Sequence, residues 1–221
     1  YMFISNVAGI SVVNSQVTGA ARVGGFMGES YNGTGIFKAQ VDNVTVNGSD
    51  EVGGLVGRIW DGTLNNIVQS SVKATVTGTG SSVGGIAGYS KSGDFIESFS
   101  EGSVAGNSNV GGIVGYTYEN AGIHNCYSKN SVAGNQNVGG IAGLFISYHD
   151  GVSETYFAGQ IAAEGSFIGG FLGNYTAGTR RSNYWDVTKN PIAGVGNGNR
   201  PEITGKTTAE MFQQGTYVGW D

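Results

Sequence analysis

Apolar and small residues recur along the chain in one hexapeptide, Val-Gly-Gly followed by two apolar residues and a third Gly. Six copies begin at positions 23, 52, 83, 110, 138 and 168, the last with Ile in place of Val. The successive intervals are 29, 31, 27, 28 and 30 residues, too regular for chance and too long for a coiled coil. Each copy is therefore expected to mark one structural unit stacked on the next, as in a solenoid.

Two further segments keep the same period. One ends in a β-branched residue, at Val17, Val46, Val76, Val104, Val132 and Ile161. The other begins with an apolar residue and spans 64–69, 95–100, 123–128 and 152–157. These pieces are too short for helices and lack a 3.6-residue period, so about three strand-like pieces are predicted in each unit of about 29 residues. The predicted fold is all-β, a right-handed parallel β-helix of about six coils with a prism-shaped core.

The glycines of the hexapeptide require a structural reason, because a glycine in an ordinary strand position costs about 0.5–1 kcal/mol relative to Ala. The Gly-Gly pair is expected to turn a corner with positive φ, or to let neighbouring backbones approach closely. The two apolar residues after the pair are expected to fill the interior. The expected interior columns are Phe26, Leu55, Ile86, Ile113, Ile141 and Phe171, and Met27, Val56, Ala87, Val114, Ala142 and Leu172.

An aromatic series keeps the same period. It contains Phe99, Tyr127, Tyr156 and Tyr184, at intervals of 28, 29 and 28 residues. The rings either stack on sugars or form an internal stack with the Tyr hydroxyls at an edge. The internal stack is favoured, because the series keeps the period of the core and continues upstream at Val68.

The pattern changes near residue 174. Residues 180–187 are predicted to form the last partial coil, and a Gly- and Asn-rich loop follows through Gly198. Thr207 and Glu210 offer a capping box for a short helix that reaches about Gln214, and residues 217–220 are predicted to be extended. The predicted organisation is a solenoid over 1–186 and a helix-containing C-terminal cap over 187–221, which covers an open strand edge. Because the sequence begins without Met, we expect neighbouring domains of a larger polypeptide.

Composition narrows the classes of function. The chain has 41 Gly and 2 Pro in 221 residues, with 39% hydrophobic and 12% charged residues, so it is neither collagen-like nor a charged disordered chain. The net charge of −5 and 11 scattered basic residues argue against nucleic-acid partners. One Cys excludes an intrachain disulfide. No apolar run approaches the roughly 18 residues of a membrane span, so no membrane insertion is predicted.

The hexapeptide copies closely resemble the GLUG motif, which occurs in bacterial surface and secreted proteins. These include adhesin-like proteins and parts of IgA-specific metallopeptidases. The resemblance covers residues 23–173, and the tail from Asn183 to Asp221 is similar to a segment that often follows such arrays. It implies an extracellular or cell-surface repeat module. It does not imply one activity, because the module accompanies unlike activities.

No catalytic constellation accompanies the repeat. His124 and His149 lack the His-Glu-x-x-His context of a zinc peptidase. His124 and Cys126 can share one side of a strand, but no third ligand is evident, so the pair is interpreted as structural and no metal or other cofactor is predicted. A glycan-cleaving β-helix needs carboxylates gathered on one face, and the 16 acidic residues form no column. The chain is predicted not to be an enzyme, with a polysaccharide lyase or hydrolase as the alternative.

Large rings gather in the turn after each hexapeptide. They are Tyr31, Trp60, Tyr89, Tyr116, Tyr118, Phe145, Tyr148 and Tyr175. Rings on variable loops above a rigid scaffold make binding surfaces, although they can also cover the corners of the core. Trp60, Tyr89, Tyr116 and Tyr118 are the candidate ligand-binding residues. The predicted function is a non-catalytic extracellular module that binds a host or environmental glycan or a surface protein, or that acts as a spacer.

Overall fold

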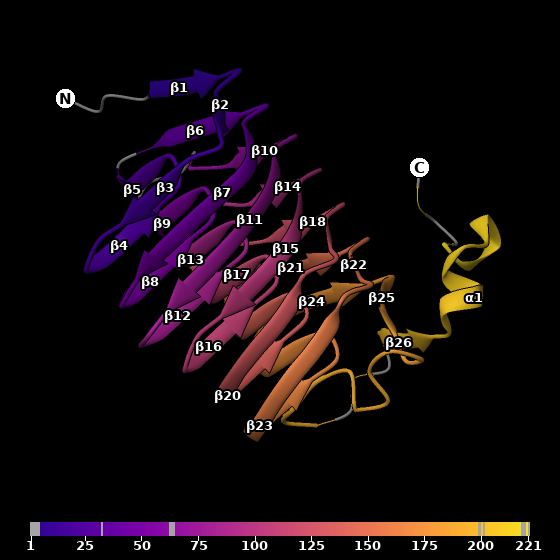
Figure 1. Ribbon diagram of the computed structural model, residues 1–221. Coiled ribbons are helices and arrows are strands. Elements are labelled where there is room, and N and C mark those ends of the chain that lie inside the picture. Colours follow the sequence, from indigo (N-terminus) through magenta and orange to yellow (C-terminus); the bar gives the residue numbers. More distant parts are fainter. Residues whose placement is uncertain are drawn as a thin grey trace.

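The computed structural model describes residues 5–31, 33–61, 65–198, 200, 202–217 and 220. The chain winds as a parallel β-solenoid of about six turns, from the indigo N-terminal coil to the orange C-terminal coil (Figure 1). The predicted all-β repeat fold is confirmed. In the middle of the array one coil contains four strands, one more than predicted, because the hexapeptide spans a corner between two of them.

Within the described residues, the first of the two sheets has 11 strands. One column contains β1 (Ser5–Ala8), β6 (Thr34–Phe37), β10 (Ile67–Val68), β14 (Phe95–Ile96) and β18 (Ile123–His124). The other column contains β5 (Met27–Ser30), β9 (Val56–Ile59), β13 (Ala87–Ser92) and β17 (Val114–Asn120). The long strands β21 (Ala142–Ser153) and β24 (Leu172–Arg181) extend across both columns.

The second sheet has 15 strands in the part of the chain that the structure describes. One column contains β2 (Ser11–Val13), β3 (Gln16–Thr18), β7 (Gln40–Gly48), β11 (Ser71–Gly78), β15 (Phe99–Ala105), β19 (Tyr127–Ser128), β22 (Tyr156–Phe157), β25 (Asn183–Asp186) and β26 (Ile203–Lys206). The other contains β4 (Ala21–Gly24), β8 (Asp50–Gly53), β12 (Ser81–Gly84) and β16 (Ser108–Gly111). Strands β20 (Ser131–Gly139) and β23 (Gln160–Gly169) extend across both columns.

Close approach of neighbouring atoms explains the second glycine of each hexapeptide: these atoms are backbone in the first four copies and the rings of Phe157 and Trp185 in the last two. A Cβ built on Gly85 would overlap the carbonyl oxygen of Gly112, and one on Gly112 would overlap that of Gly140. The coils are held together here by backbone hydrogen bonds such as Ile86 N–H to the Ile113 carbonyl, at 2.8 Å. Only a residue without a side chain fits this contact.

Positive φ does not occur at the Gly-Gly pairs, contrary to one of the two expectations. It occurs at the residue immediately before each hexapeptide, as at Ser82 (φ 62°) and Asn109 (φ 51°). The full set is Arg22, Glu51, Ser82, Asn109, Asn137 and Phe167. The left-handed residue bends the chain just before the corner, and the glycines after it allow the coils to stack closely.

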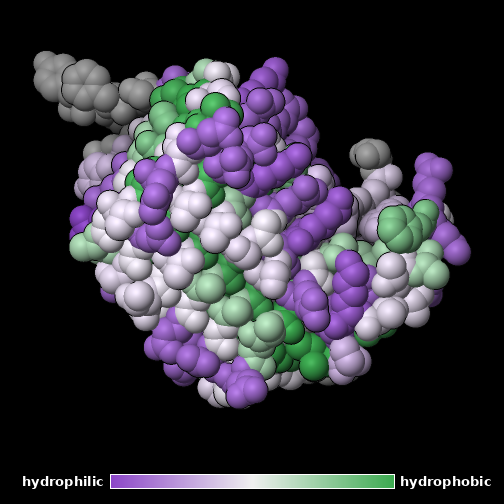
Figure 2. Space-filling view, viewed as in Figure 1, coloured by the Kyte–Doolittle hydropathy of each residue, from purple (hydrophilic) through white to green (hydrophobic). Residues whose placement is uncertain are grey.

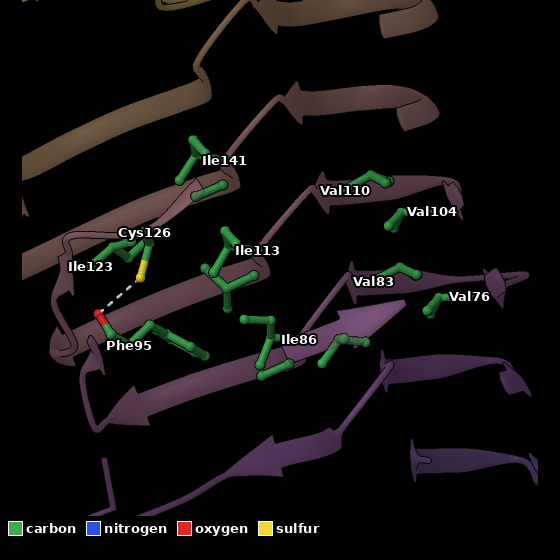
Figure 3. Packing of buried hydrophobic residues seen from close by; sticks show 14 of the residues in the cluster. Val76, Val83, Ile86, Phe95, Val104, Val110, Ile113, Ile123, Cys126 and Ile141 are labelled. Atoms are coloured by element: carbon green, nitrogen blue, oxygen red, sulfur yellow. Dashed lines mark hydrogen bonds between the residues drawn. The ribbon is translucent and has the colours of Figure 1, made fainter. Parts of the chain in front are cut away.

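The apolar columns fill the interior as predicted. Leu55, Ile86, Ile113, Ile141 and Phe171 are fully buried, and the middle members point into the space between the sheets (Figure 3). At about 1.5–3 kcal/mol per fully buried large side chain, this column contributes on the order of 10 kcal/mol. Phe26, in the first coil, is only partly buried, although it still packs against the core.

A ladder of buried polar residues lines the other corner of each coil, where the chain passes from the first sheet back to the second. Its members are Ser70, Ser98, Cys126, Thr155 and Asn183. Each side chain satisfies backbone groups of its own or the adjacent coil: the Ser98 hydroxyl accepts from Ser70 N–H at 3.0 Å, and Thr155 accepts from Cys126 N–H at 3.3 Å. Buried backbone groups at this corner are thereby paired, as a stable interior requires.

The C-terminal residues fold against the last coil. Strand β26 pairs in parallel with β25, so the stack gains one more rung beyond residue 186. Helix α1 (Thr208–Met211) follows, with the predicted capping box between Thr207 and Glu210, and a 3₁₀ turn spans Gln214–Thr216. The helix lies beside β26 at the C-terminal end (Figure 1). The division at 186 and 187 stays a prediction, and part of the predicted extended segment at 217–220 lies outside the described residues.

The outer surface is mixed in polarity. Figure 2 shows purple and white side chains over much of the visible face, with a narrow green band that follows the stack. In the part of the chain that the structure describes, no helix has the length and hydrophobicity of a membrane span.

Candidate ligand-binding face

The four candidate rings come together on the outer surface of the first sheet. Tyr89 in β13 pairs in register with Tyr116 in β17, and Trp60 directly follows β9. The ring centroids of Trp60 and Tyr89 are 5.7 Å apart, and those of Tyr89 and Tyr116 are 5.2 Å apart. Tyr118 lies 6.3 Å from Tyr116, and Tyr148 lies 6.0 Å from Tyr118. We call these five residues the aromatic row.

Two cations lie at the N-terminal end of the aromatic row. The guanidinium carbon of Arg58 is 3.7 Å from the ring centroid of Trp60, and Lys91 Nζ is 5.1 Å from it. Both cations are ion-paired: Lys91 contacts Asp61 at 3.3 Å, and Arg58 contacts Glu29 at 3.4 Å. The row therefore combines ring faces with charged groups that can exchange partners with a polar ligand.

The aromatic row differs in exposure from ring to ring. Tyr148 is 58% exposed, whereas Tyr89 is only 8% exposed. Burial raises the pKa of both Tyr89 and Tyr116, so each phenol is protonated at neutral pH and can donate a hydrogen bond. Trp60, Tyr116 and Tyr118 are half-buried. The row thus combines one buried ring, three half-buried rings and one largely exposed ring at its end.

Two of the eight rings assigned to this edge by the sequence are instead interior. Phe145 is fully buried and Tyr175 is 8% exposed, and the two rings stack at 6.3 Å with an interplanar angle of 10°. Phe145 pairs in register with Thr117, which is also fully buried. Side chains alternate across a strand, so the second residue after each hexapeptide points inward, while the first and third point outward.

The periodic aromatic series also differs from its prediction. Phe99, Tyr127 and Tyr156 lie on the outside of the second sheet, where the rings stack at 4.7 Å and 5.2 Å with interplanar angles of 3° and 9°. The next residue along each strand points inward: Phe157, which follows Tyr156, is fully buried. The favoured internal stack is therefore wrong.

The upstream and downstream neighbours of this outer stack follow from the register. Phe99 pairs with Ser71, not with Val68, so the series does not continue upstream as an aromatic or apolar column. Downstream, Tyr217 packs edge-on against Tyr184 at 5.6 Å, and Trp220 lies 6.1 Å from Tyr184. The C-terminal segment thereby covers this end of the stack.

His124 and Cys126 do not face a common site. Asn125 between them has a φ of 53°, so the chain turns and the two side chains separate. Cys126 is buried, and its thiol donates to the carbonyl of Phe95 at 3.4 Å (Figure 3). Burial raises the pKa of Cys126 to about 12, which keeps the thiol protonated and unreactive. The structural interpretation of Cys126 agrees with this environment.

Four charged residues from neighbouring coils form a network beside Trp60. Arg22 contacts Glu29 at 3.1 Å and Glu51 at 3.5 Å, and Arg58 contacts the same two carboxylates at 3.4 Å and 3.5 Å. The spacing of acidic residues in the sequence did not reveal this group, because Glu29 lies in β5 after the hexapeptide corner and Glu51 lies in β8 before it. Its two positive and two negative charges balance.

Comparison with known families identifies one repeat. Residues 106–133 match the family model of the GLUG motif. The chain contains the GLUG motif. The matched GLUG repeat is one coil of the solenoid, from β16 through β19 to the start of β20. Comparisons with curated proteins and with solved structures gave no match.

Proposed function

We propose that this GLUG-repeat solenoid is a non-catalytic module of a bacterial surface or secreted protein, and that it binds a glycan through the aromatic row. The observation that carries the proposal is the continuous contact of Trp60, Tyr89, Tyr116, Tyr118 and Tyr148 along the outer face of a rigid sheet. Rings held in this way lose little conformational entropy on binding. A surface protein is the alternative ligand for the same rings. Neighbouring domains of a larger polypeptide would carry the module.

Sugars suit this face for physical reasons. Aromatic faces pack against the apolar C–H faces of pyranose rings, and the neutral phenols of Tyr89 and Tyr116 can hydrogen-bond to hydroxyls at the edges. Arg58 and Lys91 at one end favour a glycan with a carboxylate or sulfate group near that end. The net charge of −5 disfavours long polyanions over the rest of the surface.

A screen of the chain against glycan and host-protein arrays tests the proposal, followed by titration of the hits. Changing Trp60 and Tyr116 together to Ala is expected to weaken binding by ~2 kcal/mol or more, about 30-fold in Kd, with little change in the unfolding midpoint. The matched control is Phe212→Ala, because that ring is 87% exposed and lies outside the aromatic row. An empty screen, or a double variant that unfolds instead of losing binding, would leave the rings as surface packing on a spacer.

One observation favours a second candidate function, a polysaccharide-active enzyme. Glu29 and Glu51 lie together with Arg22 and Arg58 beside the ring of Trp60, and hydrolytic glycan cleavage requires a pair of carboxyl groups. An assay of a polysaccharide panel for new reducing ends or unsaturated products tests it. Turnover that disappears in Glu29→Gln or Glu51→Gln would replace the non-catalytic proposal.

A further inference from the structure

Three potential metal ligands from three successive coils converge where the first sheet bends between its two columns. Asp94 directly precedes β14, His124 ends β18, and Asp150 lies in β21. One donor atom of each residue lies within 4.8 Å of the donor atoms of the other two. His124 Nε2 is 3.0 Å from Asp150 Oδ1. Among the residues that the structure describes, these three form the one such group.

Each of the three side chains is held in place by a further hydrogen bond. His124 Nδ1 is 2.9 Å from the hydroxyl of Ser153, which leaves Nε2 facing the carboxylates. The N–H of Gly122 donates to Asp94 Oδ1 at 2.9 Å, and that of Gly151 donates to Asp150 Oδ1 at 2.8 Å. Metal-binding imidazoles and carboxylates are commonly oriented by such outer partners.

The backbone beneath the three side chains leaves them room. A Cβ built on Gly122 would overlap His124 Nε2 and would lie 2.8 Å from Asp150 Cγ. Gly122 has no positive φ, so the neighbouring cluster, rather than the backbone conformation, disfavours a side chain there. The side chains of His124 and Asp150 are 25% and 36% exposed, so an ion from solvent can reach them.

We propose that Asp94, His124 and Asp150 bind one divalent transition-metal ion of the Zn²⁺ class. Zn²⁺ binds imidazole nitrogen and carboxylate oxygen at about 2.0–2.2 Å, which places tetrahedral donors about 3.4 Å apart. The observed donor spacing needs only small side-chain movements to reach this geometry. Ca²⁺ prefers six to eight oxygens, and a mixed nitrogen and oxygen set favours a transition metal. A bound ion ties three coils together, with water completing its coordination.

The primary test is calorimetric titration of tag-free, chelator-treated protein with Zn²⁺. One ion per chain is expected to bind, and saturating Zn²⁺ is expected to raise the thermal unfolding midpoint, because the three ligands meet only in the folded chain. Titration with Ca²⁺ serves as the comparison and is expected to show much weaker binding. Failure of the wild-type chain to bind Zn²⁺ stoichiometrically overturns the proposal.

Matched variants assign the ion to these residues. His124→Ala, Asp94→Asn and Asp150→Asn are each expected to weaken Zn²⁺ binding by at least about 10-fold. The control is His149→Ala, since the other histidine of the chain is exposed, adjacent to Asp150 in sequence and outside the group. Unchanged affinity in His124→Ala, or loss of binding in His149→Ala, contradicts the assignment.

A spectroscopic measurement keeps the test decisive if a variant fails to fold. X-ray absorption at the zinc edge of the wild-type complex is expected to show a first shell of nitrogen and oxygen donors only. Cys126 is buried with its thiol donating to backbone carbonyls, so sulfur has no place in the predicted shell. A sulfur donor in the spectrum would assign the ion to Cys126 and overturn the proposal. This test is independent of glycan binding by the aromatic row.

Discussion

At the residue scale, the second glycine of a central hexapeptide is the position least able to change. Gly85→Val and Gly112→Val each force a branched side chain into the backbone of the next coil. Because that backbone is hydrogen-bonded and cannot move aside, each variant is expected to lose about 3 kcal/mol or more of unfolding free energy. The midpoint and slope of chemical denaturation measure the loss.

The control for these variants follows from the structure. Gly198 in the C-terminal loop is not a suitable control. It has a φ of 142°, and a Cβ built on it would lie 3.0 Å from Arg200, so valine is strained at this position also. Gly215 is exposed, and a Cβ built on it meets no atom within 4 Å. Gly215→Val is expected to change stability by no more than about 0.5 kcal/mol. Equal midpoints for Gly85→Val and Gly215→Val would refute the close-approach argument.

At the scale of single elements, a side-chain bridge between coils makes stability depend on pH. Asp50 Oδ1, in β8, accepts from the backbone N–H of Ser81 at 2.7 Å and from its hydroxyl at 3.0 Å. The backbone hydrogen bond from Ser81 lowers the pKa of Asp50 below its ordinary value of 3.8. A depressed carboxyl pKa in the folded state contributes stability above the unfolded pKa and loses it as pH falls through the folded pKa.

Asp50→Asn is therefore expected to lower the free energy of unfolding at pH 6. The difference in unfolding free energy between wild type and variant is expected to shrink progressively as the pH falls below about 4. Denaturation midpoints of the wild type and the variant between pH 2 and pH 7 measure the difference. Glu164→Gln is a suitable control, because that carboxylate is exposed in β23. A constant gap between wild type and Asp50→Asn across this pH range would contradict the role assigned to the ionised carboxylate.

At the scale of the whole molecule, the register predicts that one complete coil can be removed. Ala105 pairs with Ala133, so deletion of residues 106–133 joins Ala105 to Gly134 in the geometry that Ala133 has now. The shortened chain is expected to keep a β-type circular dichroism spectrum and a cooperative transition, with a lower unfolding midpoint. In a repeat array, stability sums over coils and their interfaces.

Deletion of half a coil, residues 106–119, is the matched control. It joins strands that belong to different columns, so every later coil would be displaced, and this variant is expected not to fold cooperatively. If both deletions fold, or neither does, the coil is not the unit of the fold. The outcome is read by thermal and chemical denaturation followed by circular dichroism.

The repeat, the coil length and the residues of the interior columns could all be predicted from the sequence. Short-range physics sufficed for these, because a glycine that admits no side chain and an apolar residue that must be buried recur at one spacing. The capping box of Thr207 and Glu210 was also predictable, since its hydrogen bonds join residues three apart. Trp60, Tyr89, Tyr116 and Tyr118 were also predicted to lie together, because each follows its hexapeptide by one to three residues and successive coils stack in register. Their role in ligand binding stays a prediction.

The side of the sheet that each remaining residue faces depends on how the coils fold and stack, which the sequence pattern did not reveal. The outward stack of Tyr127 and Tyr156 and the burial of Phe145 depend on the left-handed residues at the corners, which reset the alternation of side chains. A shift of one residue in the alternation along a strand moves every side chain to the opposite face of the sheet. The repeat period of about 29 residues does not determine at which residue that alternation begins. Stacking also brings Asp94, His124 and Asp150 of three successive coils together, although no shared motif marks these positions in the sequence.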